Sequence, residues 1–274
     1  MSDINRRVLP GFRLSLGYTV VYLAILVLVP LTACFLKAAT LPWDRFWAAV
    51  TTDRAIAAYE LTVGASLVAA AVNVVVGALV AWVLVRYDFP LKRILDSLVD
   101  LPFALPTAVA GLVYSTLYVQ SGWLGRFLVP LGIQAAYSRL AIVLVLVFVG
   151  FPFVVRTLEP VLERLDADVE EAAACLGATR FQTVARVILP SLYPALITGF
   201  ALSFARALGE YGSVVFVSGN MPFKTEIAPV LIVARLEEFA YAEATAIAVV
   251  LLLISFTVLI VVNMLERWSR RVYA

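Results

Sequence analysis

Six apolar stretches separated by more polar segments dominate this chain. The hydrocarbon core of a bilayer is about 30 Å thick, so a helix needs about 20 mostly apolar residues to cross it with its backbone polar groups satisfied internally. The six stretches meet or approach that length, and the pattern predicts an all-α, polytopic membrane protein with six transmembrane helices. They are Leu14 to Leu36, Leu61 to Val85, Leu101 to Gly125, Leu140 to Val155, Val187 to Ala205 and Ala244 to Leu265.

Three of the stretches are expected to deviate from a simple span. Pro102 and Pro106 predict an irregular start to the third, because proline lacks a backbone N–H. The fourth is short and is expected to borrow residues from 134–139 or 156–158. The fifth is followed by the ionisable pair Arg206 and Glu210 before apolar residues resume.

The composition excludes a soluble domain with a charged shell. Hydrophobic residues make up 63% of the 274 residues, charged residues only 15%, and the mean hydropathy is +0.97. No repeat, low-complexity tract or long linker divides residues 1–274, so a single transmembrane domain is expected. The net charge of +2 identifies no partner, and no nucleic acid is expected among the partners.

The basic residues predict the orientation, because positive charge is retained on the cytoplasmic side of a membrane. More of them lie at the two termini and in the second and fourth connecting segments than on the other side. Six spans with this bias place both termini in the cytoplasm. The residues on the predicted cytoplasmic side are Arg6, Arg7, Arg13, Arg86, Lys92, Arg93, Arg156, Arg164, Arg180, Arg186, Arg267, Arg270 and Arg271.

Chemistry of the usual catalytic kinds is missing from the sequence. The chain has no histidine, and none of its three lysines lies in a glycine-rich loop of the kind that cradles the phosphates of ATP. The sequence therefore predicts no catalytic residue, no metal site and no cofactor in this chain. If ATP drives transport, separate ATPase subunits must bind the ATP and its magnesium.

The largest predicted cytoplasmic segment, about residues 156–190, has a helical pattern. Acidic residues 166–171 suit the positive N-terminal end of a helix, and Gly177 allows a sharp turn after it. A second short helix is expected over roughly 179–188, with Pro190 opening the next span in its first turn. A solvated acidic loop without a partner is the alternative, and these residue patterns alone leave both open.

Glu171-Ala172-Ala173, Gly177 and the segment from Val187 to Pro190 resemble the EAA motif of the permease subunits of ABC importers, with valine where isoleucine is more usual. The resemblance implies a type I importer transmembrane domain whose permease core covers residues 59–265. It also implies that residues 159–190 form a cytoplasmic loop with a coupling helix that fits a groove on the ATPase. The implied coupling residues are Glu171, Ala172, Ala173, Gly177, Leu189 and Pro190.

Further segments resemble one branch of that family. Residues 100–111 and 203–212 are similar to the sulfate and molybdate permeases, and residues 6–12 and 224–239 are similar to the T-type permeases of sulfate/thiosulfate importers. Molybdate permeases usually have glycine after the proline that matches Pro222, whereas this chain has Phe223. The resemblance therefore favours the sulfate branch, with molybdate or tungstate as the alternative cargo.

The family resemblance implies a transport subunit of the bacterial inner membrane that is not itself an enzyme. Its implied partners are a second homologous permease, two cytoplasmic ATPase subunits and a periplasmic sulfate/thiosulfate-binding protein. Alternating access is the implied mechanism. An ATP-independent secondary anion transporter remains a rival class, and a homodimeric rather than heterodimeric permease pair also stays open.

Five residues are candidates for the translocation path: Arg206, Glu210, Pro102, Pro106 and Thr107. Ionisable groups within a span are costly and by default face a protein interior or a water-filled path. Arg206 and Glu210 are four residues apart, so an internal ion pair is one interpretation, and a positive potential for a divalent oxyanion is the other. The prolines either expose backbone amides to an anion or kink a wall helix.

Overall fold

The apolar stretches form long helices, since a helix satisfies its own backbone hydrogen bonds in a medium without water. The computed structural model describes residues 12–273, and no strand occurs within that range. Among these residues, five helical segments are long and apolar enough to cross a membrane. They are Leu14–Ala38, Asp53–Arg86, Arg139–Glu163, Arg180–Leu208 and Tyr241–Arg267.

The first half of the chain contains α1 (Phe12–Leu23), the π-helix η1 (Ala24–Leu28), α2 (Val29–Ala38), α3 (Trp43–Val50), α4 (Asp53–Arg86), α5 (Lys92–Val99), α6 (Leu101–Ala104), α7 (Thr107–Tyr118), α8 (Gly125–Leu128) and the 3-10 helix η2 (Val129–Leu131). The second half contains α9 (Arg139–Glu163), α10 (Ala167–Cys175), α11 (Arg180–Thr183), the π-helix η3 (Val184–Ile188), α12 (Leu189–Leu208), α13 (Val214–Val217), α14 (Ala228–Glu237) and α15 (Tyr241–Tyr273).

The expected irregular spans take specific forms. The third apolar stretch breaks at Leu105 and Pro106 into α6 and the 12-residue α7, which is shorter than a full span. The count of six transmembrane helices therefore stays a prediction. The fourth stretch extends at both ends into the 25-residue α9. Arg6 and Arg7 lie outside the described residues.

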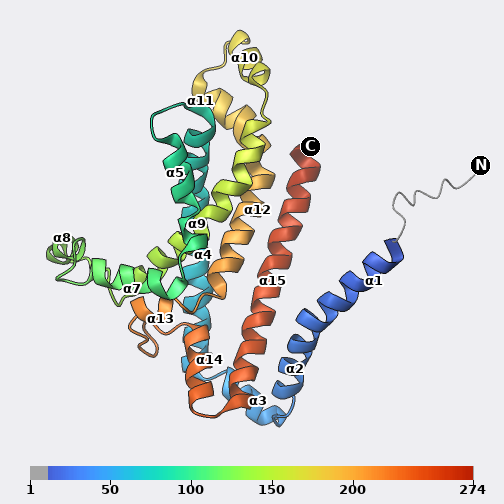
Figure 1. The fold of residues 1–274 in the computed structure, drawn as a ribbon, viewed down its shortest axis with the longest axis vertical. Helices are drawn as coiled ribbons and strands as arrows, with labels where there is room; N and C mark the ends of the chain where they lie inside the picture. Colours follow the sequence, from blue (N-terminus) through green and yellow to red (C-terminus); the bar gives the residue numbers. More distant parts are fainter. Residues whose placement is uncertain (1–11, 274) are drawn as a thin grey trace, which may run out of the picture.

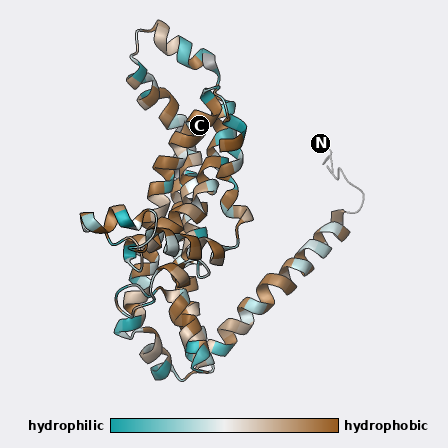
Figure 2. Ribbon diagram, turned by 60° about the vertical axis from the view of Figure 1, so that its left-hand side comes forward, coloured by the Kyte–Doolittle hydropathy of each residue, from teal (hydrophilic) through white to brown (hydrophobic). Residues whose placement is uncertain are grey.

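The long helices α4, α9, α12 and α15 run side by side (Figure 1). The α10–α11 segment lies at one end of this bundle, as does the C-terminal end of α15, while α3 and α14 lie at the opposite end. Figure 2 shows hydrophobic residues along the long helices and hydrophilic ones gathered toward their ends, as expected for segments surrounded by lipid. Helix α2 packs against α15 near α3, whereas α1 diverges from the bundle, and most of the large apolar side chains of α1 and α2 are exposed.

Small residues bring α4, α9 and α12 together. The buried face of α4 is rich in alanine, and Val154 of α9 lies between glycines of its two neighbours. A Cβ on Gly77 would lie 2.9 Å from the Val154 side chain, and a Cβ on Gly199 would lie 3.2 Å from the Val154 Cα. Such close approach is how membrane helices associate, because lipid removes the hydrophobic drive between them. Larger side chains here would separate the three helices.

A buried hydrogen bond adds specificity to the same junction. Asn73 Nδ2 of α4 donates to Ser203 Oγ of α12 at 2.9 Å, and both side chains are fully buried. Gly150 of α9 faces this pair: a Cβ there would lie 2.4 Å from Ser203 Oγ and 2.7 Å from Asn73 Nδ2. Glycine at position 150 of α9 therefore leaves room for the polar contact between α4 and α12.

Gly150→Ala is expected to destabilise the protein by about 1–3 kcal/mol, because the added methyl overpacks the core and displaces a buried hydrogen bond. Gly64→Ala, also within a helix, is the matched control, since a Cβ at Gly64 meets no atom within 4 Å. We expect the control to be neutral or slightly stabilising. Thermal unfolding in detergent measures both, and equal melting temperatures for the two variants would contradict the packing argument.

Ion pairs and backbone contacts tie the opposite end of the bundle together. Arg54, in the first turn of α4, donates through Nε and Nη2 to the two carboxylate oxygens of Glu226, both at 2.7 Å. Arg139, at the start of α9, donates to the backbone carbonyls of Lys224 and Phe223. The segment before α14 is therefore anchored to the ends of two long helices.

Candidate functional site

The predicted loop helix is α10, and its ends follow from the sequence. Asp166 is its extended N-terminal cap residue, and Asp168 and Glu170 lie in the first turn, where negative charge is favoured. At the other end Gly177 has φ +79. The Ala178 N–H donates to the Ala173 carbonyl and the Gly177 N–H to the Ala174 carbonyl. This is the Schellman arrangement, and its left-handed residue is usually glycine.

The segment after Gly177 differs from its prediction. Thr179 and Gln182 form a reciprocal capping box that starts α11, close to the expected position. The expected short helix does not stop before Pro190, however. It continues through the π-helix η3 into α12, so that 29 residues from Arg180 to Leu208 form one helical segment. Pro190 does lie in the first turn of α12, as predicted, but no break separates α12 from the helix before it. The missing N–H of Pro190 follows a π-helical turn, where hydrogen bonding is already irregular.

The α10–α11 segment presents apolar side chains on an otherwise polar tip. Glu171 and Ala172 are exposed, whereas Ala173 faces inward and is buried. Leu176 is 88% exposed and Phe181 is 81% exposed, one on each side of the Gly177 turn. Exposed apolar groups rimmed by polar ones are typical of protein interaction sites. Leu176 and Phe181 were not among the predicted coupling residues, although both are large apolar residues within a polar loop.

A charged contact ties α10 to the end of α4. Arg86 Nη2 lies 2.6 Å from Glu170 Oε1, and the Arg86 guanidinium also lies over the Trp82 ring, 5.3 Å from its centroid. These residues line a cavity of about 870 Å³ between α4, α10 and the start of the α11–α12 segment. Leu189 also lines it, whereas Pro190 is not among its lining residues. The position of α10 is therefore set by α4 as well as by the chain on either side.

Arg156 of α9 binds the carboxylates of Asp96 in α5 and of Asp100 at the end of α5. Its Nε and Nη2 donate to the two oxygens of Asp100, at 2.9 and 2.6 Å, and Nη2 also donates to the Asp96 carbonyl. Nη1 donates to Asp96 Oδ1 at 2.6 Å and to Glu159 Oε2 at 2.7 Å. These contacts use all five N–H groups of the guanidinium. They fix α5 against α9 near the α10 end of the bundle, and the sequence analysis did not find them.

Arg206 and Glu210 form the ion pair that their spacing predicted. Arg206 Nη1 lies 2.6 Å from Glu210 Oε2, with the Glu210 side chain 3% exposed and the Arg206 side chain 34% exposed. The expected shared helix face is wrong in detail, because α12 ends at Leu208 and Glu210 lies beyond it. The other Glu210 oxygen accepts from the Ser213 backbone N–H and hydroxyl, both at 2.9 Å.

The start of α7 packs against the turn that holds Glu210. A Cβ on Gly212 would lie 2.3 Å from Thr107 Oγ1, and a Cβ on Gly111 would lie 2.2 Å from the Ser213 carbonyl oxygen. Pro106 is the extended cap residue just before α7. The structure thus brings Pro106 and Thr107 close to the Arg206–Glu210 turn. Pro102 belongs instead to α6, which packs on α9.

Part of this region faces outward from the chain. On α12, Leu202 and Ala205 are exposed next to Arg206, as is the cap residue Gly209. On α7, Val109, Leu112 and Val113 are exposed. The Arg206 side chain, 34% exposed, therefore lies at the edge of an exposed face of the chain rather than in a closed interior.

Comparisons with known proteins identify a matching family and similar chains. Residues 73–271 match the family described as binding-protein-dependent transport system inner membrane component. The chain is similar to the sulfate transport system permease protein CysT of Synechococcus elongatus (54% identity over 257 residues, 94% of this chain and 92% of that protein) and to that of Synechocystis sp. (53% over 253 residues, 92% and 88%).

A solved structure also has a similar fold. It is a chain of a bacterial alginate ABC transporter in complex with an alginate pentasaccharide-bound periplasmic protein, with a TM-score of 0.76, 17% sequence identity and 93% of each chain covered. The family match begins within α4 and ends within α15. It therefore includes α10, α11 and all of α12.

Proposed function

The chain belongs to the family of binding-protein-dependent transport system inner membrane components, and on that premise we propose that it is the permease half of an ATP-driven importer of sulfate or thiosulfate. The observation that carries the cargo is the 54% identity to a sulfate permease over 94% of the chain. Importers of this class have a binding protein on the outer side of the membrane and an ATPase on the cytoplasmic side.

The proposed topology is six spans in a bacterial inner membrane with both termini in the cytoplasm. The short α7, together with α6, completes the six. In Figure 1 the α10–α11 segment and the end of α15 lie at the same end of the bundle. Arg86, Lys92, Arg93, Arg164 and Arg180 belong to segments at that end, as the positive-inside rule requires of a cytoplasmic side.

Within residues 159–190, we assign the contact with the ATPase to α10 and the turn after it. Glu171, Ala172 and Gly177 are exposed on this tip, and Leu176 and Phe181 add apolar anchors of the kind that dominate binding energy. Ala173 faces inward and allows close packing. Leu189 and Pro190 begin α12 and would transmit a displacement of the α10–α11 segment to that helix. The ATPase subunits supply ATP and magnesium, and this chain performs no covalent chemistry.

The proposed transport cycle is alternating access between two permeases. A periplasmic sulfate/thiosulfate-binding protein delivers the anion to the α14 end, and closure of the two ATPases moves the α10 segments and opens the path to that side. Arg206 supplies positive potential at the exposed face, Glu210 holds its side chain, and the Pro106–Thr107 start of α7 lies beside them. Pro102 affects the path indirectly, because it lies in α6, which packs on α9.

Affinity purification of the tagged chain in mild detergent tests the assembly. Recovery of a second permease and an ATPase supports the proposal, and a single copy of the second chain per tagged chain indicates a heterodimer. Recovery of the chain alone in the presence of coexpressed neighbours, together with uptake that does not require ATP, would favour a secondary anion transporter.

Competition uptake distinguishes the cargo. With labelled sulfate in vesicles containing the binding protein, unlabelled thiosulfate and sulfate are expected to compete at similar concentrations. Molybdate is expected to compete at least about tenfold less well, which corresponds to a difference of about 1.4 kcal/mol in binding free energy. Stronger competition by molybdate or tungstate would reassign the importer to that branch.

A further inference from the structure

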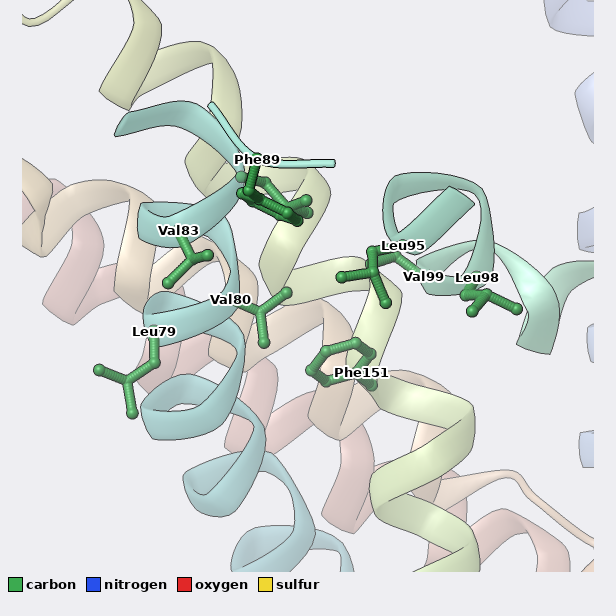
Figure 3. Close-up of a pocket in the computed structure, with 9 residues that line it drawn as sticks. Leu79, Val80, Val83, Phe89, Leu95, Leu98, Val99 and Phe151 are labelled. Carbon is green, nitrogen blue, oxygen red and sulfur yellow. The ribbon is translucent and has the colours of Figure 1, made fainter. Parts of the chain in front are cut away.

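An apolar groove lies between α4, α5 and α9, on the side of α4 where the chain turns into α5. Figure 3 shows Val80 and Val83 of α4, Phe89 of the turn, Leu95 of α5 and Phe151 of α9 around it. Its volume is about 400 Å³, within the range of about 300–1,000 Å³ typical of ligand sites. The complete lining is Leu79, Val80, Val83, Leu84, Phe89, Leu95, Leu98, Val99 and Phe151.

One basic residue of α5 lies on the same face as the lining of the groove. Lys92 precedes Leu95 and Val99 by three and seven residues, so the three share one face of α5. Its ammonium lies 3.1 Å from Asp88 Oδ1, but the Asp88 side chain is fully exposed, and such a surface pair contributes little. A phosphate at this edge of the groove would therefore meet the Lys92 ammonium above an apolar channel.

The polar face of α5 does not compete for this ligand. Asp96 and Asp100 are held by Arg156 on the α9 side. The helix thus turns its carboxylates toward α9 while Leu95, Leu98 and Val99 line the groove. The arrangement separates negative charge from the edge where an anionic headgroup would lie.

The side chains of the groove fit a flexible chain better than another helix. Membrane helices associate through small residues and polar contacts, as α4, α9 and α12 do at Gly77, Gly199 and Ser203. The groove contains neither: all nine lining residues are bulky and apolar. An acyl chain can adapt to such a surface, and each CH₂ that it buries adds to its binding.

We propose that the groove binds one acyl chain of an anionic phospholipid whose phosphate contacts Lys92. Anionic lipids are attracted to basic residues next to a membrane span. The site would hold α5, and through Arg156 also α9, in one position at the end of the bundle that carries α10. The site belongs to the inner leaflet if the proposed orientation holds, but the contact itself does not depend on the cargo.

Native mass spectrometry of the purified complex, titrated with phosphatidylglycerol or phosphatidylcholine, tests this site. Leu95→Trp fills the groove and is expected to reduce bound phosphatidylglycerol at least fivefold. Ile94→Trp is the matched control, since Ile94 is 56% exposed on the same helix and does not line the groove. Equal phosphatidylglycerol binding by the two variants would overturn the proposal.

The headgroup contact has its own pair of variants. Lys92→Gln is expected to remove most of the preference for phosphatidylglycerol over phosphatidylcholine, whereas Lys224→Gln, which changes an exposed lysine near the opposite end of the bundle, should leave it unchanged. A preference unaffected by Lys92→Gln overturns the assigned phosphate contact. Loss of the second permease from the Leu95→Trp complex, with lipid binding unchanged, would show that the groove is a protein interface instead.

Discussion

Replacing Gly177 with valine is expected to reduce ATP-dependent sulfate uptake about tenfold or more while the chain still reaches the membrane. Gly177 has φ +79, and valine in that region is a steric outlier that costs about 1–3 kcal/mol. The strain would open the turn that joins α10 to α11 and misplace the exposed tip. Uptake into vesicles, normalised to the amount of protein in the membrane, measures the effect.

Two controls separate backbone strain from the loss of a surface. Gly177→Asn retains most uptake, because asparagine tolerates the left-handed conformation better than other non-glycine residues. Nothing lies within 4 Å of a Cβ at Gly177, so side-chain bulk alone should not clash within the chain. If the asparagine and valine variants reduce uptake equally, the contact with a partner and not the turn is the sensitive feature. If neither reduces uptake, the coupling role of this segment is wrong.

Replacing Arg206 with glutamine is expected to lower uptake by at least about tenfold. The substitution leaves Glu210, 3% exposed, with only Ser213 as a hydrogen-bond donor. Removing one member of a fully buried pair costs about 3–5 kcal/mol. The cost here is smaller, since the Arg206 side chain is about one third exposed. Both uptake and the melting temperature in detergent should fall.

A double variant distinguishes the two roles of Arg206. In Arg206→Gln/Glu210→Gln no unpaired charge remains, and the amide oxygen introduced at position 210 can still accept from Ser213, so the melting temperature is expected to recover. Uptake should stay low if Arg206 provides positive potential for the anion. Recovery of uptake together with stability would mean that the pair is only structural, and Arg206 would then be removed from the path.

The parts of the fold that depend on length and periodicity were predictable. The stretches around α4, α12 and α15 are long uncharged runs, the shorter run in α9 was expected to extend at its ends, and the acidic residues 166–171 with Gly177 indicated α10 and its turn. The second short helix was also expected from about residue 179, close to where α11 starts. These features depend on neighbours in sequence, which is why the residues alone determine them.

The missed features depend on contacts between distant segments. Arg156 was counted only as a cytoplasmic charge, and nothing in the sequence pairs it with Asp96 and Asp100, about sixty residues earlier in the chain. Glu170 with Arg86 is a similar case. Glu210 was placed on a helix because its four-residue spacing from Arg206 suits one, yet Gly209 is the C-terminal cap residue of α12. Spacing identified the partners of that pair but not the backbone that joins them.

The unbroken helical segment from Arg180 to Leu208 has a mechanical consequence. At about 1.5 Å per residue its 29 residues span about 43 Å, from the exposed tip to the neighbourhood of Arg206. The π-helical turn Val184–Ile188 and Pro194 interrupt its regular hydrogen bonding, so it is not a uniform rod. A tilt that it transmits would nevertheless swing its far end in the opposite sense about a fulcrum between the two ends. The close approach of Gly199 to Val154 is such a fulcrum, and it lies nearer to Arg206 than to the tip. We therefore expect a large displacement of the α10–α11 tip to produce a smaller displacement, with a larger force, at the end of α12 near Arg206.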